Sequence, residues 1–295
     1  MPKINKITIL ITGARGFIGP HLTNYLKKKK KYKIINLPNK FYDLSDFKTF
    51  KTILVEYQPN IIIHLAARTR PTIRTKKEDR LQHKNTTLPV INLVNCVKYA
   101  TRLKKIIFFG TIEEYGLAKP PFYEKQKTRP QSSYGIAKKK AFEYVKKNID
   151  HKINYVWLRP SLVFGRINNK KRLIGSIMNG LKFNKKIKVT INGQIRDFLF
   201  IDDLCKFLNL LIKVKTNIKH NLLNVSAENF INLNNIFSYF PTKIQSKLKK
   251  IIINNPKKQH LNYYSSNRKF KKIFKNFKFT GFKRGLYLSF KSFNK

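Results

Sequence analysis

The stretch Lys6–Gly19, KITILITGARGFIG, predicts a buried strand that ends in a glycine turn and leads into a helix. Its near-continuous apolar run is typical of a strand that is covered on both faces. Gly13, Gly16 and Gly19 allow a tight turn and a close approach by a ligand, and a helix start offers free N–H groups to an anion. We interpret the turn as the pyrophosphate site of a dinucleotide, with an ordinary strand–helix connection as the alternative.

Apolar strands and amphipathic helices continue to alternate through the first half of the chain. This alternation predicts an α/β fold with a Rossmann-like, doubly wound parallel sheet. The further strands are expected at 32–37, 61–65, 105–110 and 154–158, and the helices at 17–30, 46–57, 85–100 and 133–147.

The alternation of strands and helices ends after about Arg166, and helical and loop segments then mix with one more strand. We expect an NAD(P)-binding Rossmann domain over 1–165 and a smaller substrate-binding lobe over 166–295. The two parts are expected to interleave, with the strand at 197–201 returning to the first domain.

The chain of 295 residues has 63 Lys and Arg against 14 Asp and Glu, a formal net charge of +49. A 42% hydrophobic and 13% aromatic composition excludes a disordered basic tail. Lys outnumbers Arg, 50 to 13, and Lys, Ile, Asn, Phe and Tyr dominate, which are the residues of AT-rich codons. We interpret the charge mainly as compositional drift, with a functional surface for polyanions as the alternative.

Two cysteines, Cys96 and Cys205, are too few for a disulfide framework and favour a reducing compartment. No apolar run approaches the roughly 20 residues that a membrane helix needs. The apolar stretch near the N-terminus is too short for a signal peptide. These observations predict a cytoplasmic protein with no membrane partner.

Tyr134 and Lys138 lie four residues apart on a predicted helix and therefore on one face of it. An ammonium beside a phenol favours the phenolate, so this Tyr is a candidate acid/base that exchanges a proton with a sugar hydroxyl. In a chain with 14 Tyr and 50 Lys the spacing also arises by chance.

Thr111 follows the strand expected at 105–110, so it projects at the carboxyl edge of the sheet, where ligands of such sheets bind. Its hydroxyl is a candidate partner for the same substrate oxygen, with a helix or turn cap as the alternative. His64 has no second His or Cys at a metal-ligand spacing, so we expect it to be structural and predict no metal site.

Several motifs occur in the order seen in extended short-chain dehydrogenases/reductases. They are TGARGFIG (12–19), DL (43–44), HLAA (64–67), TIEEYG (111–116), SYGIAK (133–138), LRPSLVFG (158–165) and RDFLFIDDL (196–204). Within that group the chain resembles the NAD-dependent epimerase/dehydratase family, which acts on nucleotide sugars, over roughly residues 5–240.

The resemblance implies a role for each matching residue. Tyr134 would be the acid/base, Lys138 would bind the nicotinamide ribose, and Thr111 would steady the reacting hydroxyl. The remaining positions divide among pyrophosphate contacts (Gly13, Gly16, Phe17, Ile18), adenine contacts (Asp43, Leu44), the inner cofactor site (Leu65, Ala66) and a grip on the sugar nucleotide (Arg196). A helix cap is the alternative for Asp43.

The residues do not decide between NAD and NADP as the cofactor, but they favour NADP slightly. The acid that would hold an adenosine ribose is missing at 36–40, whereas Arg15 and Lys40 are placed to meet a 2′-phosphate. Related proteins often pair through helices of the first domain, so a homodimer is expected.

The resemblance also narrows the reaction. Dehydratases of the family use a Thr-(Asp/Ser)-Glu triplet, and here the triplet is Thr111-Ile112-Glu113. Glu113 could still serve as the base, but Ile112 has no proton to donate to a departing hydroxyl. A 4-epimerase and a 4-keto reductase therefore remain, and the sequence does not separate them. A non-catalytic RNA-binding member of the same fold is the alternative, because the basic surface suits it.

Overall fold

A computed structural model describes residues 6–37, 42–69, 74–165, 172–191, 193–214, 222–240, 250–253 and 262–293. The chain divides into two compact units. The first comprises residues 1–118, 124–159 and 208–223, and the second comprises 119–123, 160–207 and 224–295.

A six-stranded sheet in the order β2-β1-β3-β4-β5-β9 forms the centre of the first unit. All pairings from β2 across to β5 are parallel. The strands are β1 (Ile7–Thr12), β2 (Tyr32–Asn36), β3 (Ile61–His64), β4 (Lys105–Phe109), β5 (Asn154–Pro160) and β9 (Leu222–Val225). Because β1 lies between β2 and β3, the chain reverses its direction of winding there, which is where ligands of such sheets bind.

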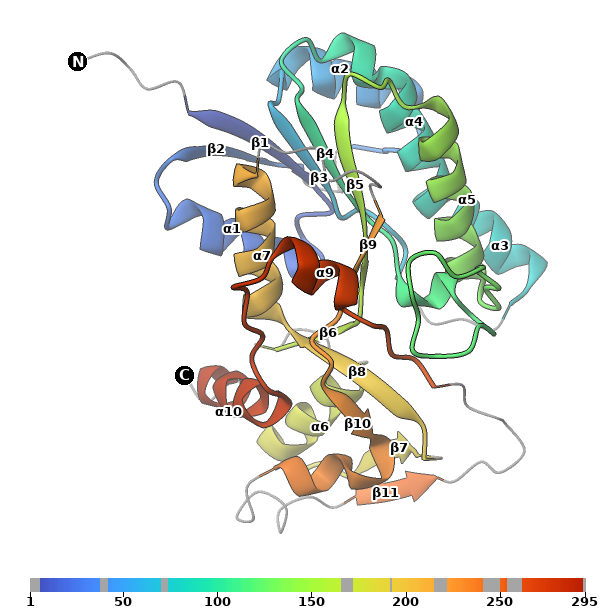
Figure 1. The fold of residues 1–295 in the computed structure, drawn as a ribbon, viewed down its shortest axis with the longest axis vertical. Coiled ribbons are helices and arrows are strands. Elements are labelled where there is room, and N and C mark those ends of the chain that lie inside the picture. The colour runs from blue at the N-terminus through green and yellow to red at the C-terminus, as the bar shows by residue number, and fades with distance from the viewer. Residues whose placement is uncertain are drawn as a thin grey trace. The chain divides into compact units, whose positions relative to one another are not determined.

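Helices cover both faces of this sheet, with α2, α4 and α5 on one side and α1 and α7 on the other (Figure 1). The helical segments are α1 (Ile18–Lys27), α2 (Phe47–Tyr57), α3 (Lys76–Gln82), η1 (His83–Thr87), α4 (Leu88–Cys96), η2 (Val97–Tyr99), η3 (Ile112–Glu114), α5 (Ser133–Asn148) and α7 (Ile201–Lys213), of which the part from Leu208 belongs to this unit. The doubly wound α/β fold predicted from the sequence is confirmed.

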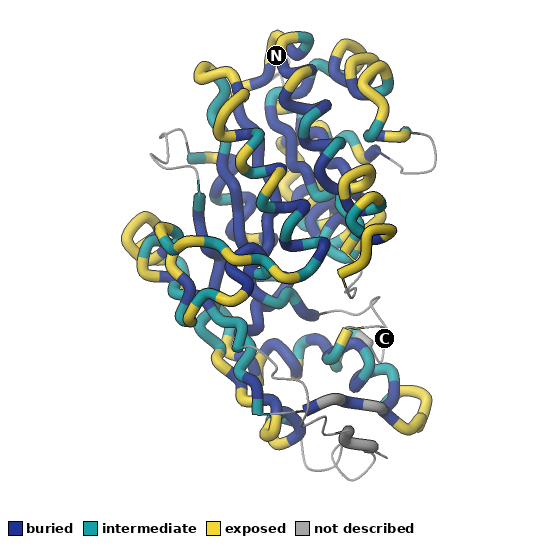
Figure 2. Tube along the Cα trace, turned by 90° about the vertical axis from the view of Figure 1, so that its right-hand side faces the viewer, coloured by how far each residue is buried: buried dark blue, intermediate teal, exposed yellow. Residues whose placement is uncertain are grey.

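The core of the first unit consists of the apolar strand residues and the inner faces of the helices. Ile62, Ile106 and Phe108 are fully buried and pack in one cluster with Phe50 of α2 and Leu93 of α4. In Figure 2 the strands are buried while the outer faces of the helices are exposed. This burial explains why the strands are apolar along their whole length and do not alternate.

Side-chain caps fix where two helices of this unit begin. The Asp46 carboxylate accepts a hydrogen bond from the backbone N–H of Thr49 at 2.7 Å at the start of α2. The Ser132 hydroxyl accepts one from the N–H of Gly135 at 3.0 Å at the start of α5. Each cap satisfies a backbone donor of the first helical turn.

The second unit contains smaller sheets. One has the order β10-β8-β6, and the other pairs β11 with β7. Phe164, Phe198 and Phe282 pack there with ring centroids 4.8 to 5.9 Å apart. The elements are β6 (Leu162–Phe164), β7 (Ile187–Thr190), β8 (Ile195–Phe200), β10 (Phe230–Asn232), β11 (Lys250–Ile253), α6 (Leu173–Lys182), η4 (Leu233–Tyr239), α9 (Arg268–Ile273) and α10 (Phe282–Phe293).

The later part of the chain differs in detail from the expected interleaving. The strand expected at 197–201 is β8, and it pairs with β6 and β10 rather than with the large sheet. The strand that extends the large sheet beside β5 is β9. The apolar run at 197–201 predicts a strand but does not identify its pairing partner, which depends on contacts distant in sequence.

Among the residues that the structure describes, no helix has the length and apolar character to cross a membrane.

Candidate active site

The glycine turn between β1 and α1 has two positions with different surroundings. Gly13 has a positive φ of 65°, and a Cβ there would lie 2.6 Å from the backbone nitrogen of Ala66. A Cβ on Gly16 would meet only the carbonyl oxygen of Gly13, at 3.2 Å. Gly13 is therefore required by the fold itself, whereas the space beside Gly16 is otherwise open.

The first turn of α1 is available to an anion. Phe17 precedes the helix without a side-chain cap, and no acidic residue lies in the first turn. Arg15 and Gly16 are exposed, and Ile18 is half-buried. Backbone N–H groups at such a helix start, with a flanking Arg, are suited to a phosphate group.

A cavity of about 250 Å³ in the first unit brings three of the predicted cofactor residues together: Asp43, Leu44 and Ala66. Leu65, just before Ala66, donates its backbone N–H to the carbonyl oxygen of Thr12 at 3.2 Å, which ties this segment to the end of β1. The other lining residues are Tyr42, Ser45, Ala67, Arg68, Lys84, Asn85 and Pro89.

Asp43 is a loop residue and does not cap α2, because Asp46 does. Its carboxylate accepts hydrogen bonds from the backbone N–H and the hydroxyl of Ser45, at 2.9 and 2.7 Å. These bonds, together with the nearby charge of Lys84, lower the pKa of Asp43 below its ordinary value. Asp43 is therefore an anionic acceptor in the cavity. Lys40, the other residue considered for a 2′-phosphate, lies outside the described residues.

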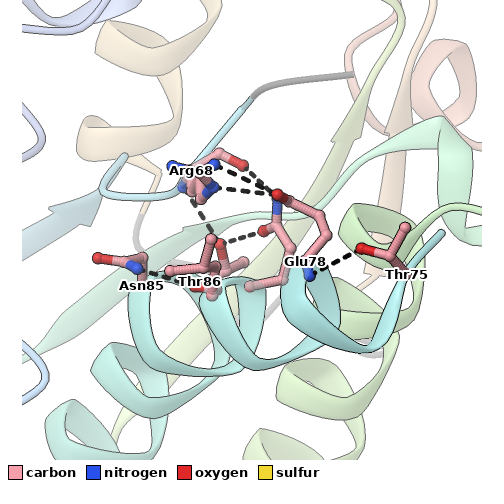
Figure 3. Close-up of polar contacts among 7 residues, drawn as sticks. Arg68, Thr75, Glu78, Asn85 and Thr86 are labelled. Carbon is pink, nitrogen blue, oxygen red and sulfur yellow. Dashed lines mark hydrogen bonds and ion pairs between the residues drawn. The ribbon is translucent and has the colours of Figure 1, made fainter. Parts of the chain in front are cut away.

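A polar network supports the cavity from the segment that follows β3 (Figure 3). Arg68 forms a bidentate ion pair with Glu78 of α3, at 3.0 and 3.2 Å. The Gln82 amide donates to Glu78 at 3.1 Å, and the Thr86 hydroxyl donates to Gln82 at 2.8 Å. The sequence predicts no helix or strand between residues 66 and 84 and does not indicate this network, because charge alone does not identify which side chains pair.

Tyr134 and Lys138 both lie on α5, as predicted. Lys138 is buried, with 1% of its surface exposed, and its Nζ donates to the carbonyl oxygen of Phe109 at 2.5 Å. The same Nζ lies 5.9 Å from the centre of the Tyr134 ring. Burial lowers the pKa of Lys138 to about 8, and the charge of Glu114 opposes that shift.

Thr111 lies two residues after the end of β4, at the same sheet edge as Phe109. Its Oγ1 accepts a hydrogen bond from the backbone N–H of Glu113 at 3.3 Å, so Thr111 does cap the short helix η3. The capping contact that was the alternative for Thr111 is therefore present. The hydrogen bond from Thr111 to a substrate oxygen remains a prediction.

Two further residues of the TIEEYG segment, Ile112 and Glu113, lie in different environments. Ile112 is buried. A Glu113 oxygen accepts a hydrogen bond from the Ser132 hydroxyl at 2.6 Å, which links this segment to the start of α5.

Glu114, which the sequence reading did not single out, is fully buried in the first unit. It pairs with Arg159 of β5 at 2.7 Å and accepts a bond from the Trp157 indole at 3.1 Å. In the sequence, Arg159 directly follows the apolar strand expected at 154–158, and Glu113 and Glu114 are consecutive acidic residues in a chain with few of them. These two features are the sequence signal for the pair.

His64 is buried at the end of β3, where its Nδ1 lies 2.9 Å from the Thr12 hydroxyl. Burial lowers the pKa of His64 to about 3. Within the described ranges, no three His, Cys, Asp or Glu side chains gather as metal ligands would.

Arg196, expected to grip the sugar nucleotide, lies on β8 and belongs to the second unit. Its guanidinium lies 5.1 Å from the centre of the Tyr263 ring and donates to the carbonyl oxygen of Ile195 at 3.2 Å.

Known proteins with similar sequences include a dTDP-D-glucose 4,6-dehydratase from Dictyostelium discoideum, 28% identical over 70% of this chain. The match spans only about half of that relative, 55% of its length. A UDP-glucuronate 4-epimerase from Thermodesulfobacterium geofontis is 25% identical over 88% of this chain and 85% of its own. A dTDP-4-dehydro-6-deoxyglucose reductase from Escherichia coli is 26% identical over 82% and 83%, respectively.

Solved structures match nearly the whole chain and show the fold. A UDP-glucuronic acid 4-epimerase from Bacillus cereus, in complex with UDP-glucuronic acid and NAD, superposes with a TM-score of 0.82 at 21% identity, covering 97% of this chain and 99% of its own. A dTDP-4-dehydrorhamnose reductase from Bacillus anthracis, in complex with NADP, gives a TM-score of 0.80 at 21% identity with the same coverage.

The family comparison agrees with the order of motifs and with the doubly wound sheet. The sequence model of the NAD dependent epimerase/dehydratase family matches residues 9–226, which include the glycine turn and the segment with Tyr134 and Lys138. The chain therefore belongs to the NAD dependent epimerase/dehydratase family.

Proposed function

We propose that this chain is an NAD(P)-dependent nucleotide-sugar 4-epimerase or 4-keto reductase in which Tyr134 acts as the acid/base. The observation that carries the proposal is the position of Lys138, buried on the Tyr134 helix and bonded to the end of β4 just before Thr111. Burying an ammonium beside a phenol costs stability, so we infer that this placement serves a function. Tuning the phenol is a function that fits its position.

The described residues fit a nicotinamide dinucleotide. Gly16 leaves open space at an uncapped helix start, which suits a pyrophosphate. The cavity beside Asp43, Leu44 and Ala66 has the place and lining expected of an adenine site. Arg15 at the turn is the described residue that favours NADP, and the choice between NAD and NADP stays open.

When bound, the nicotinamide would accept or supply a hydride. Tyr134 would take the proton from a sugar hydroxyl, or return it to the ketone oxygen, during that transfer. The Lys138 ammonium would stabilise the phenolate form of Tyr134, and the Thr111 hydroxyl would hold the same substrate oxygen. Each of these roles uses a residue at or beside the carboxyl edge of the sheet.

The substrate class is inferred from the relatives, whose names are those of enzymes of nucleotide sugars. In the second unit, Arg196 is our candidate for the ribose or diphosphate of such a substrate, because a guanidinium binds phosphate oxygens in a bidentate manner. Dehydration is disfavoured because Ile112 is apolar and buried at the position where the family's dehydratases carry a proton donor. The homodimer and the cytoplasmic location remain predictions.

The experiment is to incubate the purified protein with NAD(P)+ or NAD(P)H and a panel of UDP-, GDP-, CDP- and dTDP-sugars, including 4-keto sugars. Products are followed by NMR, and nicotinamide absorbance is read in parallel. Stoichiometric loss of NAD(P)H identifies a reductase, and an epimeric product without net loss identifies an epimerase. A panel without any product at C4 contradicts the proposal.

A further inference from the structure

Glu114 is a fully buried carboxylate to which the proposed reaction assigns no role. One of its oxygens accepts hydrogen bonds from the Thr111 backbone N–H at 2.9 Å and from the Trp157 indole at 3.1 Å. The other accepts two bonds from the Arg159 guanidinium, at 2.8 and 2.7 Å. Four donors from two segments thus converge on one carboxylate.

Arg159 is held as firmly as its partner. Its side chain is 2% exposed, and its guanidinium lies 4.6 Å from the centre of the Tyr115 ring and 5.5 Å from that of Phe142. Contact with two rings restricts the position of the guanidinium and therefore the direction of its two bonds to Glu114. The carboxylate is left with one orientation.

A buried ion pair is a poor means of adding stability, because desolvation opposes the attraction between the charges. Apolar residues of similar volume serve a core as well or better. The placement of this pair is informative in a chain that has only 14 acidic residues. Glu114 contacts the backbone of Thr111, the second residue after β4, and its charge acts on Lys138.

The charge around Lys138 comes from few described groups. Tyr134 lies on its own helix, His64 lies at the end of β3, and Glu114 lies on η3 with Arg159 beside it. His64 carries no charge near neutral pH, because burial lowers its pKa to about 3. Glu114 is the group that raises the pKa of Lys138 against the effect of burial.

We propose that Glu114, oriented by Arg159, is a positioning residue that holds the backbone of Thr111 in place and supplies a negative charge that acts on Lys138. The inference rests on the proposed function for its catalytic consequence. The contacts of Glu114 and the effect of its charge on Lys138 do not depend on the proposed function.

Two double variants separate the two roles. Glu114→Gln with Arg159→Met removes both charges but keeps an amide oxygen for Thr111 and Trp157. Glu114→Leu with Arg159→Met removes the acceptor as well. Asp203→Asn is the matched control, since Asp203 is also fully buried and accepts two bonds from Thr280 and one from Lys206 within the second unit.

The pH dependence tests the charge. Activity should fall as pH rises through the pKa of Lys138. In both double variants this upper limb should move to lower pH, because Glu114, and not Arg159, is the charge that affects the pKa of Lys138. The Asp203→Asn control should keep the wild-type limb even where its stability is lower. An unmoved limb in both double variants overturns the electrostatic role.

The turnover number tests the positioning. The Leu variant should have a kcat about tenfold or more below that of the Gln variant, with similar cofactor affinity, because only the Leu variant leaves the Thr111 N–H without an acceptor. Equal kcat values in the two variants overturn the positioning role.

A readout without substrate separates this inference from the proposed function. In protein labelled at the lysine side-chain carbons, NMR follows the titration of Lys138, assigned by its loss in Lys138→Met. The midpoint should lie near pH 8 in the wild type and lower in the Gln variant. A shared midpoint overturns the electrostatic role even if the enzyme is active, and a shifted midpoint supports that role even if no nucleotide sugar reacts.

Discussion

Gly13 and Gly16 lie three residues apart in one turn, yet a side chain at each would meet different surroundings. At Gly13 a Cβ would clash with the backbone of Ala66, and the positive φ is itself unfavourable for other residues. At Gly16 the space is open in the free protein and is where we place the pyrophosphate. The two glycines are therefore expected to fail in different ways when substituted.

Gly16→Val should abolish NAD(P)H binding while leaving the protein folded, because the new side chain occupies space that only a ligand would fill. Gly13→Ala should instead lower the free energy of unfolding, by about 1–3 kcal/mol, because the strain lies in the protein itself. NAD(P)H fluorescence titration and urea unfolding measure the two effects. Normal cofactor affinity in Gly16→Val would remove the basis for the proposed pyrophosphate site.

At the scale of single residues, the sequence predicted those positions whose meaning follows from local spacing. Tyr134 and Lys138 share a helix because they are four residues apart, and the glycine turn follows from its place after an apolar strand. Glu114 and Arg159 were missed because they are 45 residues apart, and local spacing does not show which buried charges pair.

The end of β3 carries a pH-dependent contribution to stability. His64 has a pKa of about 3 in the folded chain because it is buried, against 6.5 when exposed. Between these values the unfolded chain binds a proton that the folded chain does not, so stability falls as pH falls from about 6.5 toward 3. From pH 7 to pH 5 the expected loss from His64 is about 2 kcal/mol.

Urea unfolding of the wild type and of His64→Gln at both pH values tests this expectation. The wild type should lose about 2 kcal/mol more than the variant on going from pH 7 to pH 5. Asp197 acts in the opposite direction, because burial raises its pKa to about 6 and the folded chain then takes up a proton first. That effect is common to both proteins and cancels in the difference. Equal losses in both would show that His64 is not held neutral.

At the scale of elements, continuous apolar runs located the first five strands of the large sheet to within a few residues. The helix α3 was missed because its seven residues, KKEDRLQ, have too little apolar periodicity to distinguish a helix from a polar loop. The pairing of β8 and β9 was not predictable either, since strand order depends on contacts between distant segments.

For the whole molecule, the net charge of +49 remains the feature with least assigned function. Some of these like charges lie close together. The pKa of Lys31 is lowered by partial desolvation and by the neighbouring ammonium of Lys213. If the charge reflects composition, RNA or heparin should bind at low salt and be released by about 0.3 M salt. Saturable binding that persists at that salt concentration would instead favour an RNA-binding protein.

The most direct test of the account is the turnover of Tyr134→Phe on the nucleotide sugar that the panel identifies, followed by NMR together with nicotinamide absorbance. The ring remains and only the hydroxyl is removed, so NAD(P)H affinity should be nearly unchanged while kcat falls by about a hundredfold to ten-thousandfold. A variant that binds NAD(P)H normally and turns over at the wild-type rate would contradict the assignment of Tyr134 as the acid/base, and with it the proposed reaction.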